Sequence, residues 1–428
     1  MSTLYSKIQG QYVPTFMYMI LNLDFEKMSY LEVLHSEVFH HEFIHYLQDL
    51  STTHGMMNCI SNISILQSIA LTAKESLPFI ALPITERLGT SEYNDKLMTI
   101  VNGDSFEVWS HMLLKPINDY VSVSGIDSVV LEYYNTEKKA NETYRFGALA
   151  IRETMAYYAE RRLHKSKTVA AFPYSTGFYV AHEIYSAVAT DEMCLLAICD
   201  ASLMSCNPGV TFVEVLKDMK LTNYNPLCYK QTYDYAEQFI LRKSGKSSLQ
   251  LYATNAAIAL QTFRQYFGGD RVFDREYKFI CNSIRTALVS KRQNPYYILD
   301  LLETPLSYHS MDCLISRTKL PIMYDIYDQG YVDNRYSQSD EPDYSIFRTM
   351  YELNMFFLHK GKTGSPVEYG CWLYFFCTEH KDKYPVKDRC WTDPWELANE
   401  DYLCPFAKLW HRWGLTGMKV IYHNPGME

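Results

Sequence analysis

The residues His41, Glu42 and His45 follow the pattern H-E-x-x-H, which combines two metal-binding side chains with a neighbouring carboxylate. Residues four apart on a helix are separated by about 40° around its axis, so both imidazoles can bind the same ion. Zinc accepts imidazole ligands and, in catalytic sites, keeps one position open for water. It lowers the pKa of that water to about 7, so that Glu42 can accept a proton as the water attacks a carbonyl carbon. The pattern therefore predicts a hydrolytic Zn²⁺ site with Glu42 as general base.

The surrounding sequence predicts that this motif lies on a buried helix. Ser29 and Glu32 form a capping box, and neither Gly nor Pro follows before Gly55, so we expect one helix over residues 29–54. Eight further side chains lie on two sides of this helix: Leu34, Val38, Ile44 and Gln48 flank the histidines, and Phe39, Phe43, Leu47 and Leu50 lie opposite. A helix that is apolar on two sides is buried. A pair of core histidines without metal is the alternative interpretation.

A third zinc ligand must come from elsewhere in the chain, because two protein groups would hold the ion weakly. Residues 146–164 predict a helix that carries Glu153. Several residues share its helix face, most of them small or apolar: Leu149, Ala150, Ala156, Tyr157 and Glu160. Small residues around a carboxylate allow a second helix to approach closely, so we expect Glu153 to complete the site.

On these residues the chain resembles the zincin superfamily of zinc metallopeptidases, whose signature is H-E-x-x-H. The extended metzincin pattern would need Gly at position 48 and His at position 51, where this chain has Gln48 and Ser51. What is left is similar to the gluzincin type, and this resemblance implies that a downstream helical Glu is the third ligand. Glu153 is our choice. Glu142, which follows an Asn as in thermolysin-like enzymes, and Glu160 stay open as alternatives.

The resemblance implies two further parts of the site. Zincins have a small sheet before the metal helix, and the apolar and aromatic run over residues 12–23 is of strand character. Zincins also place a Tyr or His near the open coordination position, where it stabilises the oxyanion. Tyr157, Tyr174 and His182 are the candidates for this catalytic role, with ordinary packing as the alternative for each.

Composition limits the classes of partner and the cellular compartments that we expect. The formal net charge is −9, which argues against a nucleic-acid partner because phosphate binding needs clustered Lys and Arg. The first residues lack the apolar core of a signal peptide, and no run of about eighteen apolar residues predicts a membrane span. The 11 Cys are scattered along a chain too long to need disulfides, which favours a reducing, cytoplasmic setting.

The rest of the chain is predicted to be mainly helical. Residues 56–82 are apolar and helical in pattern, residues 106–134 carry a mixed helical pattern, and residues 172–206 contain a turn and two apolar helices. Residues 208–316 are helical with charged faces. The fold class expected is therefore mainly α, of the α+β type, with a small N-terminal sheet on the metal helix.

Three regions follow from these patterns. Residues 1–320 form a zincin-like catalytic region, and residues 321–345, rich in Tyr, Asp, Ser and Gly, form a loop or linker. Residues 346–428 form a C-terminal region that is dense in aromatic residues and Cys.

The C-terminal region holds a second group of metal-binding residue types. Cys371, Cys377, Cys390 and Cys404, with His380 nearby, could build a structural zinc site. Their spacing lacks the short C-x-x-C pairs that such sites use, so buried free thiols are the simpler explanation.

The function expected from the sequence is an intracellular zinc-dependent endopeptidase that hydrolyses a protein or peptide substrate. Narrow specificity, or activation by a regulatory protein partner or signal, would suit a toxin, stress or defence role. Two alternatives stay open. The protein could be a non-enzymatic helical regulatory or interaction protein with a structural metal, or a zinc hydrolase of non-peptide bonds.

Overall fold

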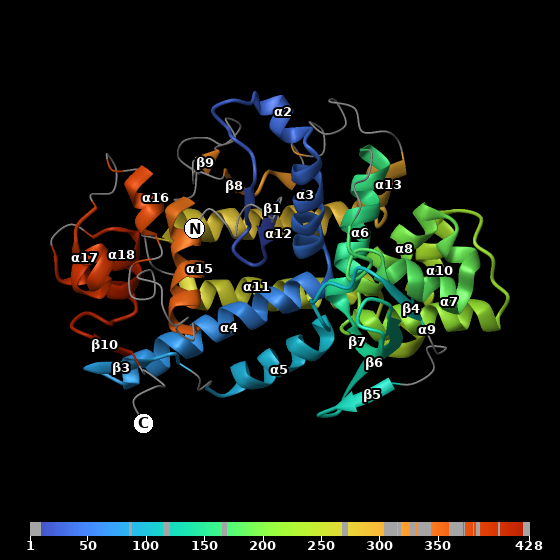
Figure 1. The fold of residues 1–428 in the computed structure, drawn as a ribbon, viewed down its shortest axis with the longest axis horizontal. Helices are drawn as coiled ribbons and strands as arrows, with labels where there is room; N and C mark the ends of the chain where they lie inside the picture. Colours follow the sequence, from blue (N-terminus) through green and yellow to red (C-terminus); the bar gives the residue numbers. More distant parts are fainter. Residues whose placement is uncertain are drawn as a thin grey trace.

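The computed structural model describes residues 10–84, 88–113, 120–164, 169–267, 273–303, 315, 318–325, 330–331, 344–358, 371, 373–379, 381, 386–400 and 403–422. These residues fold mainly into helices, with three small sheets (Figure 1). The mainly helical α+β class is therefore confirmed.

The predicted helix over residues 29–54 is wrong in its extent. The capping box of Ser29 and Glu32 is present, but it starts only the short helix α2 (Tyr30–Leu34). The H-E-x-x-H motif lies on the next helix, α3 (Glu37–Ser51). The motif is therefore on a shorter helix than the apolar pattern suggests.

Two hydroxyl side chains explain the breaks on either side of α3. Ser36 accepts the N–H of Phe39 at 3.2 Å and begins α3. Thr52 accepts the N–H of Gly55 at 3.0 Å and begins α4 (Thr53–Glu75). Ser and Thr favour cap positions because their oxygens bond nearby backbone N–H groups that a helix interior would pair.

Helix α3 is buried on both sides, as predicted. The four apolar residues opposite the histidines are all at most 2% exposed: Phe39, Phe43, Leu47 and Leu50. The helix packs against α4, α6 (Ala148–Leu163), α12 (Asp274–Gln293) and the strand β1 (Gly10–Val13). Figure 1 shows α3 beside α6 in the middle of the molecule. The prediction of a helix over residues 146–164 is confirmed by α6.

The predicted N-terminal strand region forms a hairpin rather than one strand. β1 pairs antiparallel with β2 (Tyr18–Leu21). The turn between them places Thr15 at φ 73° and Met17 at φ 54°, left-handed values that reverse the chain direction. β1 is an edge strand of the sheet, whose order is β1-β2-β8-β9. The outer side of β1 faces α3, where the backbone N–H of Tyr12 donates to Glu42 of the motif.

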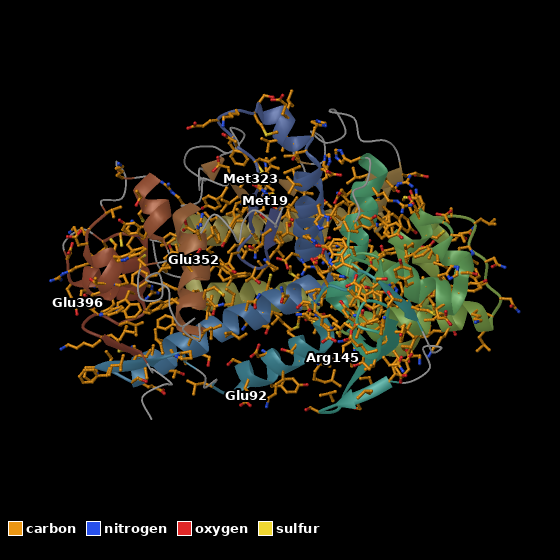
Figure 2. All side chains as sticks on the ribbon, in the orientation of Figure 1. Met19, Glu92, Arg145, Met323, Glu352 and Glu396 are labelled. Atoms are coloured by element: carbon orange, nitrogen blue, oxygen red, sulfur yellow. The ribbon has the colours of Figure 1, made fainter. Side chains whose placement is uncertain are left out.

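The other half of this sheet comes from the segment predicted as a loop or linker. β8 (Ile322–Tyr324) pairs parallel with β2, and β9 (Gly330–Tyr331) pairs with β8. Met19 and Met323 are partners in this register and lie next to each other in Figure 2. Residues about 300 positions apart in the chain thus complete one sheet, which packs against α3 through β1 and β2.

The prediction of a helical pattern over residues 106–134 is wrong, because this part of the chain forms an antiparallel sheet. Its strands are β4 (His111–Leu113), β5 (Tyr120–Val123), β6 (Ile126–Asn135) and β7 (Ala140–Phe146). Along β6, the side chains of Val129, Leu131 and Tyr133 are buried at every second position. This period of two is typical of a strand. β7 leads through Gly147 directly into α6.

The remaining helices follow the expected pattern. The described parts of residues 172–316 form α7 (Thr176–Ala189), α8 (Glu192–Leu203), α9 (Pro208–Leu221), α10 (Tyr229–Ser244), α11 (Ser248–Phe267), α12 and α13 (Tyr297–Glu303). α5 (Thr90–Asn102) packs beside α4. The helical pattern of residues 56–82 holds up to Glu75, after which β3 (Phe79–Leu82) follows.

The C-terminal region consists of one 15-residue helix and several shorter elements, which gather at one end of the molecule (Figure 1). They are α15 (Tyr344–Leu358), α16 (Tyr374–Glu379), α17 (Arg389–Thr392), the 3₁₀ helix η3 (Pro394–Asn399), α18 (Pro405–Arg412) and β10 (Lys419–Tyr422). β10 pairs parallel with β3, which ties this region to the end of α4.

One described helix, α4, is long and apolar enough to cross a membrane by length and composition alone. In its most apolar window, 56% of the residues are buried inside the protein, where α4 packs against α3, α5 and α11. Core helices commonly have this composition. The packing accounts for the apolar character of α4.

The close approach of α3 and α4 depends on Gly55. A Cβ atom at this position would overlap the backbone carbonyl of Asp49 in α3. We therefore expect Gly55→Ala to lower the free energy of unfolding by about 1–3 kcal/mol through overpacking, measured by urea denaturation. Ser64→Ala on the same helix adds no atom and is the control, with an expected change within about 0.5 kcal/mol. Equal stability of the two variants would show that the helices separate without cost.

Candidate metal centre

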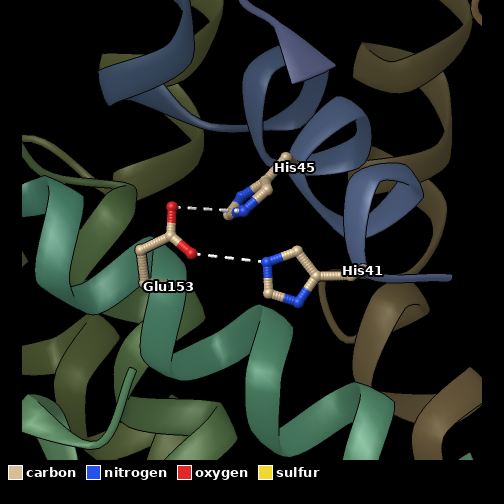
Figure 3. Close-up of side chains that lie close together, drawn as sticks. All are labelled: His41, His45 and Glu153. Atoms are coloured by element: carbon tan, nitrogen blue, oxygen red, sulfur yellow. Dashed lines mark hydrogen bonds and ion pairs between the residues drawn. The ribbon is translucent and has the colours of Figure 1, made fainter. Parts of the chain in front are cut away.

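Three predicted ligands meet between α3 and α6. Nε2 of His41 lies 3.3 Å from one carboxylate oxygen of Glu153, and Nε2 of His45 lies 3.4 Å from the other (Figure 3). The three ligand atoms all lie within 4.8 Å of one another. Among the described residues, no other group of three or more His, Cys, Asp and Glu side chains meets this spacing. The structure thus brings together the two histidines of the motif and the glutamate chosen from α6.

The other nitrogen of each imidazole has its own partner. Nδ1 of His41 lies 2.9 Å from Oε2 of Glu160, and Nδ1 of His45 lies 2.9 Å from Oε1 of Gln48. An acceptor at Nδ1 holds its proton there and leaves the Nε2 lone pair free to bind a cation. Glu160 therefore contacts a ligand rather than the ion position. Gln48 has the same role toward His45. The spacing of three residues on one helix is a signal in the sequence that could have indicated this contact.

The charges of the centre are strongly coupled. Burial alone would lower the pKa of His41, but hydrogen bonds with Glu153 and Glu160 raise it well above its ordinary value. Burial would raise the pKa of Glu153, but the charges and hydrogen bonds of His45 and His41 lower it well below its usual range. This carboxylate attracts positive charge between the two imidazoles. A divalent cation would compete with protons for the same position.

The donor set fits zinc. Two imidazole nitrogens and one carboxylate are ligands that zinc accepts, and three protein ligands leave a fourth position for water. The partners at both Nδ1 atoms orient the rings for this purpose. If zinc binds here, His41, His45 and Glu153 would hold it.

Glu42 is held by the edge strand rather than by the three ligands. Its side chain is buried, and Oε2 accepts the backbone N–H of Tyr12 at 2.6 Å. A Cβ atom at Gly10 would come within 2.9 Å of the Glu42 side chain. A larger residue at position 10 would therefore displace either β1 or the Glu42 side chain. Burial raises the pKa of Glu42, although the nearby His41 and His45 lower it in part. A carboxylate with a raised pKa is a stronger base.

Two carboxylates on one stripe of α3 attach the hairpin. Asp49 lies seven residues, or two helical turns, beyond Glu42. Its Oδ2 accepts the hydroxyl of Tyr12 and the backbone N–H of Thr15, each at 2.9 Å. The hairpin is therefore fixed to α3 at Tyr12 in β1 and at Thr15 in the turn, which sets its distance from the motif. Sequence patterns alone did not indicate this role for Asp49.

A cavity of about 260 Å³ lies beside the three ligands. It is lined by Gly10, Gln11, Tyr12, Pro14, His41, Glu42, His45, Leu149, Arg152, Glu153 and Tyr174. The edge strand therefore forms one wall, and α3 and α6 form others. Arg152 was not expected from the sequence, and it supplies a positive charge in this wall.

Of the three residues proposed to stabilise an oxyanion, Tyr174 is the one that lines the cavity. Its ring lies 6.2 Å from that of His41. Tyr157 is buried and packs against the rings of Tyr158 and Tyr174. His182 is exposed on α7, with its ring near Phe178. Neither Tyr157 nor His182 lines the cavity. Tyr157 is held by packing against its neighbouring rings, and His182 lies on the exposed side of α7.

Glu142, the alternative third ligand, lies on β7 and has other partners. Its carboxylate accepts hydrogen bonds from Lys138, Tyr133 and Asn135 at 2.7–3.0 Å. The bond from Lys138 and the other two lower the pKa of Glu142 to about 2. These partners hold the carboxylate on the sheet rather than at the histidines.

The chain matches no protein-family model, no curated protein and no solved structure.

Zinc affinity distinguishes the proposed roles of the three glutamates. Glu160→Ala removes only the partner of His41 and should weaken zinc binding roughly 10–100-fold. Glu153→Ala removes a ligand and should weaken it by more than this, whereas Glu142→Ala should leave it unchanged. Competition with a chromophoric chelator measures all three affinities, and circular dichroism checks that each variant is folded. A loss in Glu142→Ala without one in Glu153→Ala would contradict the assignment.

Proposed function

We propose that the protein is a zinc-dependent peptidase of the zincin type, with His41, His45 and Glu153 as metal ligands and Glu42 as general base. The observation that supports this proposal best is that three ligand atoms and a buried carboxylate share one cavity with an edge strand. A purely structural metal site would need neither the cavity nor Glu42. The compartment we propose is the cytoplasm.

In this proposal, the residues of the chain divide the chemical work. When bound, zinc would supply a water of lowered pKa and polarise the carbonyl group of the substrate. Glu42 would accept a proton from the attacking water and pass it to the leaving amine. Burial and nearby carboxylates raise the pKa of Tyr174, so its hydroxyl stays protonated and can donate to the oxyanion.

The edge strand supports an extended peptide as the substrate. Among the described strands β1 ends its sheet, and Gly10, Gln11 and Tyr12 line the cavity beside the ligands. Extended peptides bind such edges because their backbone groups pair along the strand. The small cavity suits narrow specificity, and a regulatory partner could further limit access to it.

One observation favours the second candidate, a zinc hydrolase that acts on a non-peptide bond. Arg152 lines the cavity and offers a guanidinium beside the ligands, and its Nε lies 3.4 Å from Oε1 of Gln48. A guanidinium binds carboxylate and phosphate groups well. A substrate with an anionic group would therefore also suit the site.

Glu42→Gln separates catalysis from metal binding. The amide keeps the shape of the side chain but cannot accept a proton, so hydrolysis should fall by about 10²–10⁴-fold. Zinc content should stay as in the wild type, since Glu42 is not a ligand. Cleavage is measured as new peptide termini in a cell lysate incubated with each protein.

The control for this experiment is Glu92→Gln, which changes an exposed carboxylate that pairs with Lys96 on α5. It should yield the same new termini as the wild type. If Glu42→Gln also yields them, the peptidase proposal is wrong. If no protein yields new termini while all bind zinc, a structural metal or a non-peptide substrate is favoured.

A further inference from the structure

The C-terminal region contains four cysteines that do not belong to the centre between α3 and α6. Cys371, Cys377 and Cys390 are buried, Cys404 is partly buried, and all four are free thiols. They lie on or beside the short elements α16, α17 and α18. His380, which lies near them in the sequence, is outside the described residues.

The four thiols converge, although 33 positions separate the first from the last. The backbone N–H of Cys371 donates to the carbonyl oxygen of Cys390 at 2.7 Å, which joins two of the segments. All six pairs of thiols lie near enough to influence each other electrostatically, although no three of the four sulfur atoms lie within 4.8 Å of one another. The fold therefore gathers these residues in one place.

Backbone groups point at several of the sulfur atoms. Sγ of Cys390 accepts the N–H of Lys387 at 3.4 Å, and Sγ of Cys404 accepts the N–H of Ala407 at 3.5 Å. The backbone of Leu373 interacts in the same way with Cys371. Hydrogen bonds of this kind stabilise negative charge on sulfur and are common around metal-bound thiolates.

The local architecture also suits a metal crosslink. The elements around the cysteines are short: α16 has 6 residues, α17 has 4, η3 has 6 and α18 has 8. Such short helices have few internal hydrogen bonds and gain little stability of their own. Small regions of this kind are commonly stabilised by a structural metal.

We propose that Cys371, Cys377, Cys390 and Cys404 bind a second zinc ion as four thiolate ligands. The thiols release their four protons to solvent, and the sulfur atoms coordinate at about 2.3 Å. Among the described residues only the His41, His45 and Glu153 group already holds its ligand atoms within 4.8 Å. Binding would thus draw the sulfur atoms together by rotation of the short cysteine side chains. Four protein ligands leave no open position, so this ion is structural.

Metal analysis of the full chain tests the proposal, which does not depend on the peptidase activity. The wild type should contain two zinc ions per chain, and both Cys390→Ser and His41→Ala should contain one. Cys206→Ser changes an exposed cysteine outside the cluster and is the control, with two expected. Equal zinc content in wild type and Cys390→Ser would overturn the proposal.

Cobalt spectroscopy gives an answer even if Cys390→Ser fails to fold. His41→Ala keeps all four cysteines, so cobalt bound to this variant should show the intense near-ultraviolet thiolate-to-cobalt band. Absence of this band would overturn the proposal, as would disulfides among the four residues found by thiol labelling and mass spectrometry. Iron in place of zinc, with the visible absorption of an iron–sulfur cluster, would overturn the choice of metal.

Discussion

The contact of one carboxylate with two imidazoles is the interaction on which the rest of the structure depends. Glu153 on α6 reaches His41 and His45 on α3 at 3.3–3.4 Å, in a place where burial penalises the charged forms of His41 and Glu153. Charged groups persist in such surroundings only when they are paired and hydrogen-bonded. The two helices must therefore lie close together. Ala150 and Ala156 on α6 are buried and allow this approach.

A second set of contacts fixes the positions of these three side chains. Glu160 and Gln48 fix the imidazole rings, and the side-chain amide of Gln48 also donates to the carbonyl oxygen of Arg152 at 3.2 Å, which links α3 to α6. On the same α3, Glu42 and Asp49 attach the edge strand β1. Helix α3 thus positions two of the three proposed ligands, the proposed base and the proposed substrate edge, because residues at different angles around it face different neighbours.

Strand pairing over long distances in the sequence joins the C-terminal part of the chain to the elements around this centre. β8 completes the N-terminal sheet by pairing with β2, and β10 pairs with β3 just after α4. The C-terminal cysteines therefore lie in a region that the β3–β10 pairing joins to the end of α4. Helix α4 in turn packs against the metal helix α3. A structural ion there would stabilise the short helices without contacting the proposed catalytic centre.

What the sequence by itself determined were the features that depend on local spacing. The H-E-x-x-H motif, the burial of α3 on two sides and the helix that carries Glu153 follow from helical periodicity, which acts over a few residues. The tertiary structure alone decided which distant groups meet: Tyr12 at Glu42, β8 beside β2, and Tyr174 rather than His182 at the cavity. Such contacts depend on how whole elements pack. That packing also turned residues 106–134 into a sheet, since strand pairing and burial between partners outweigh weak local preferences.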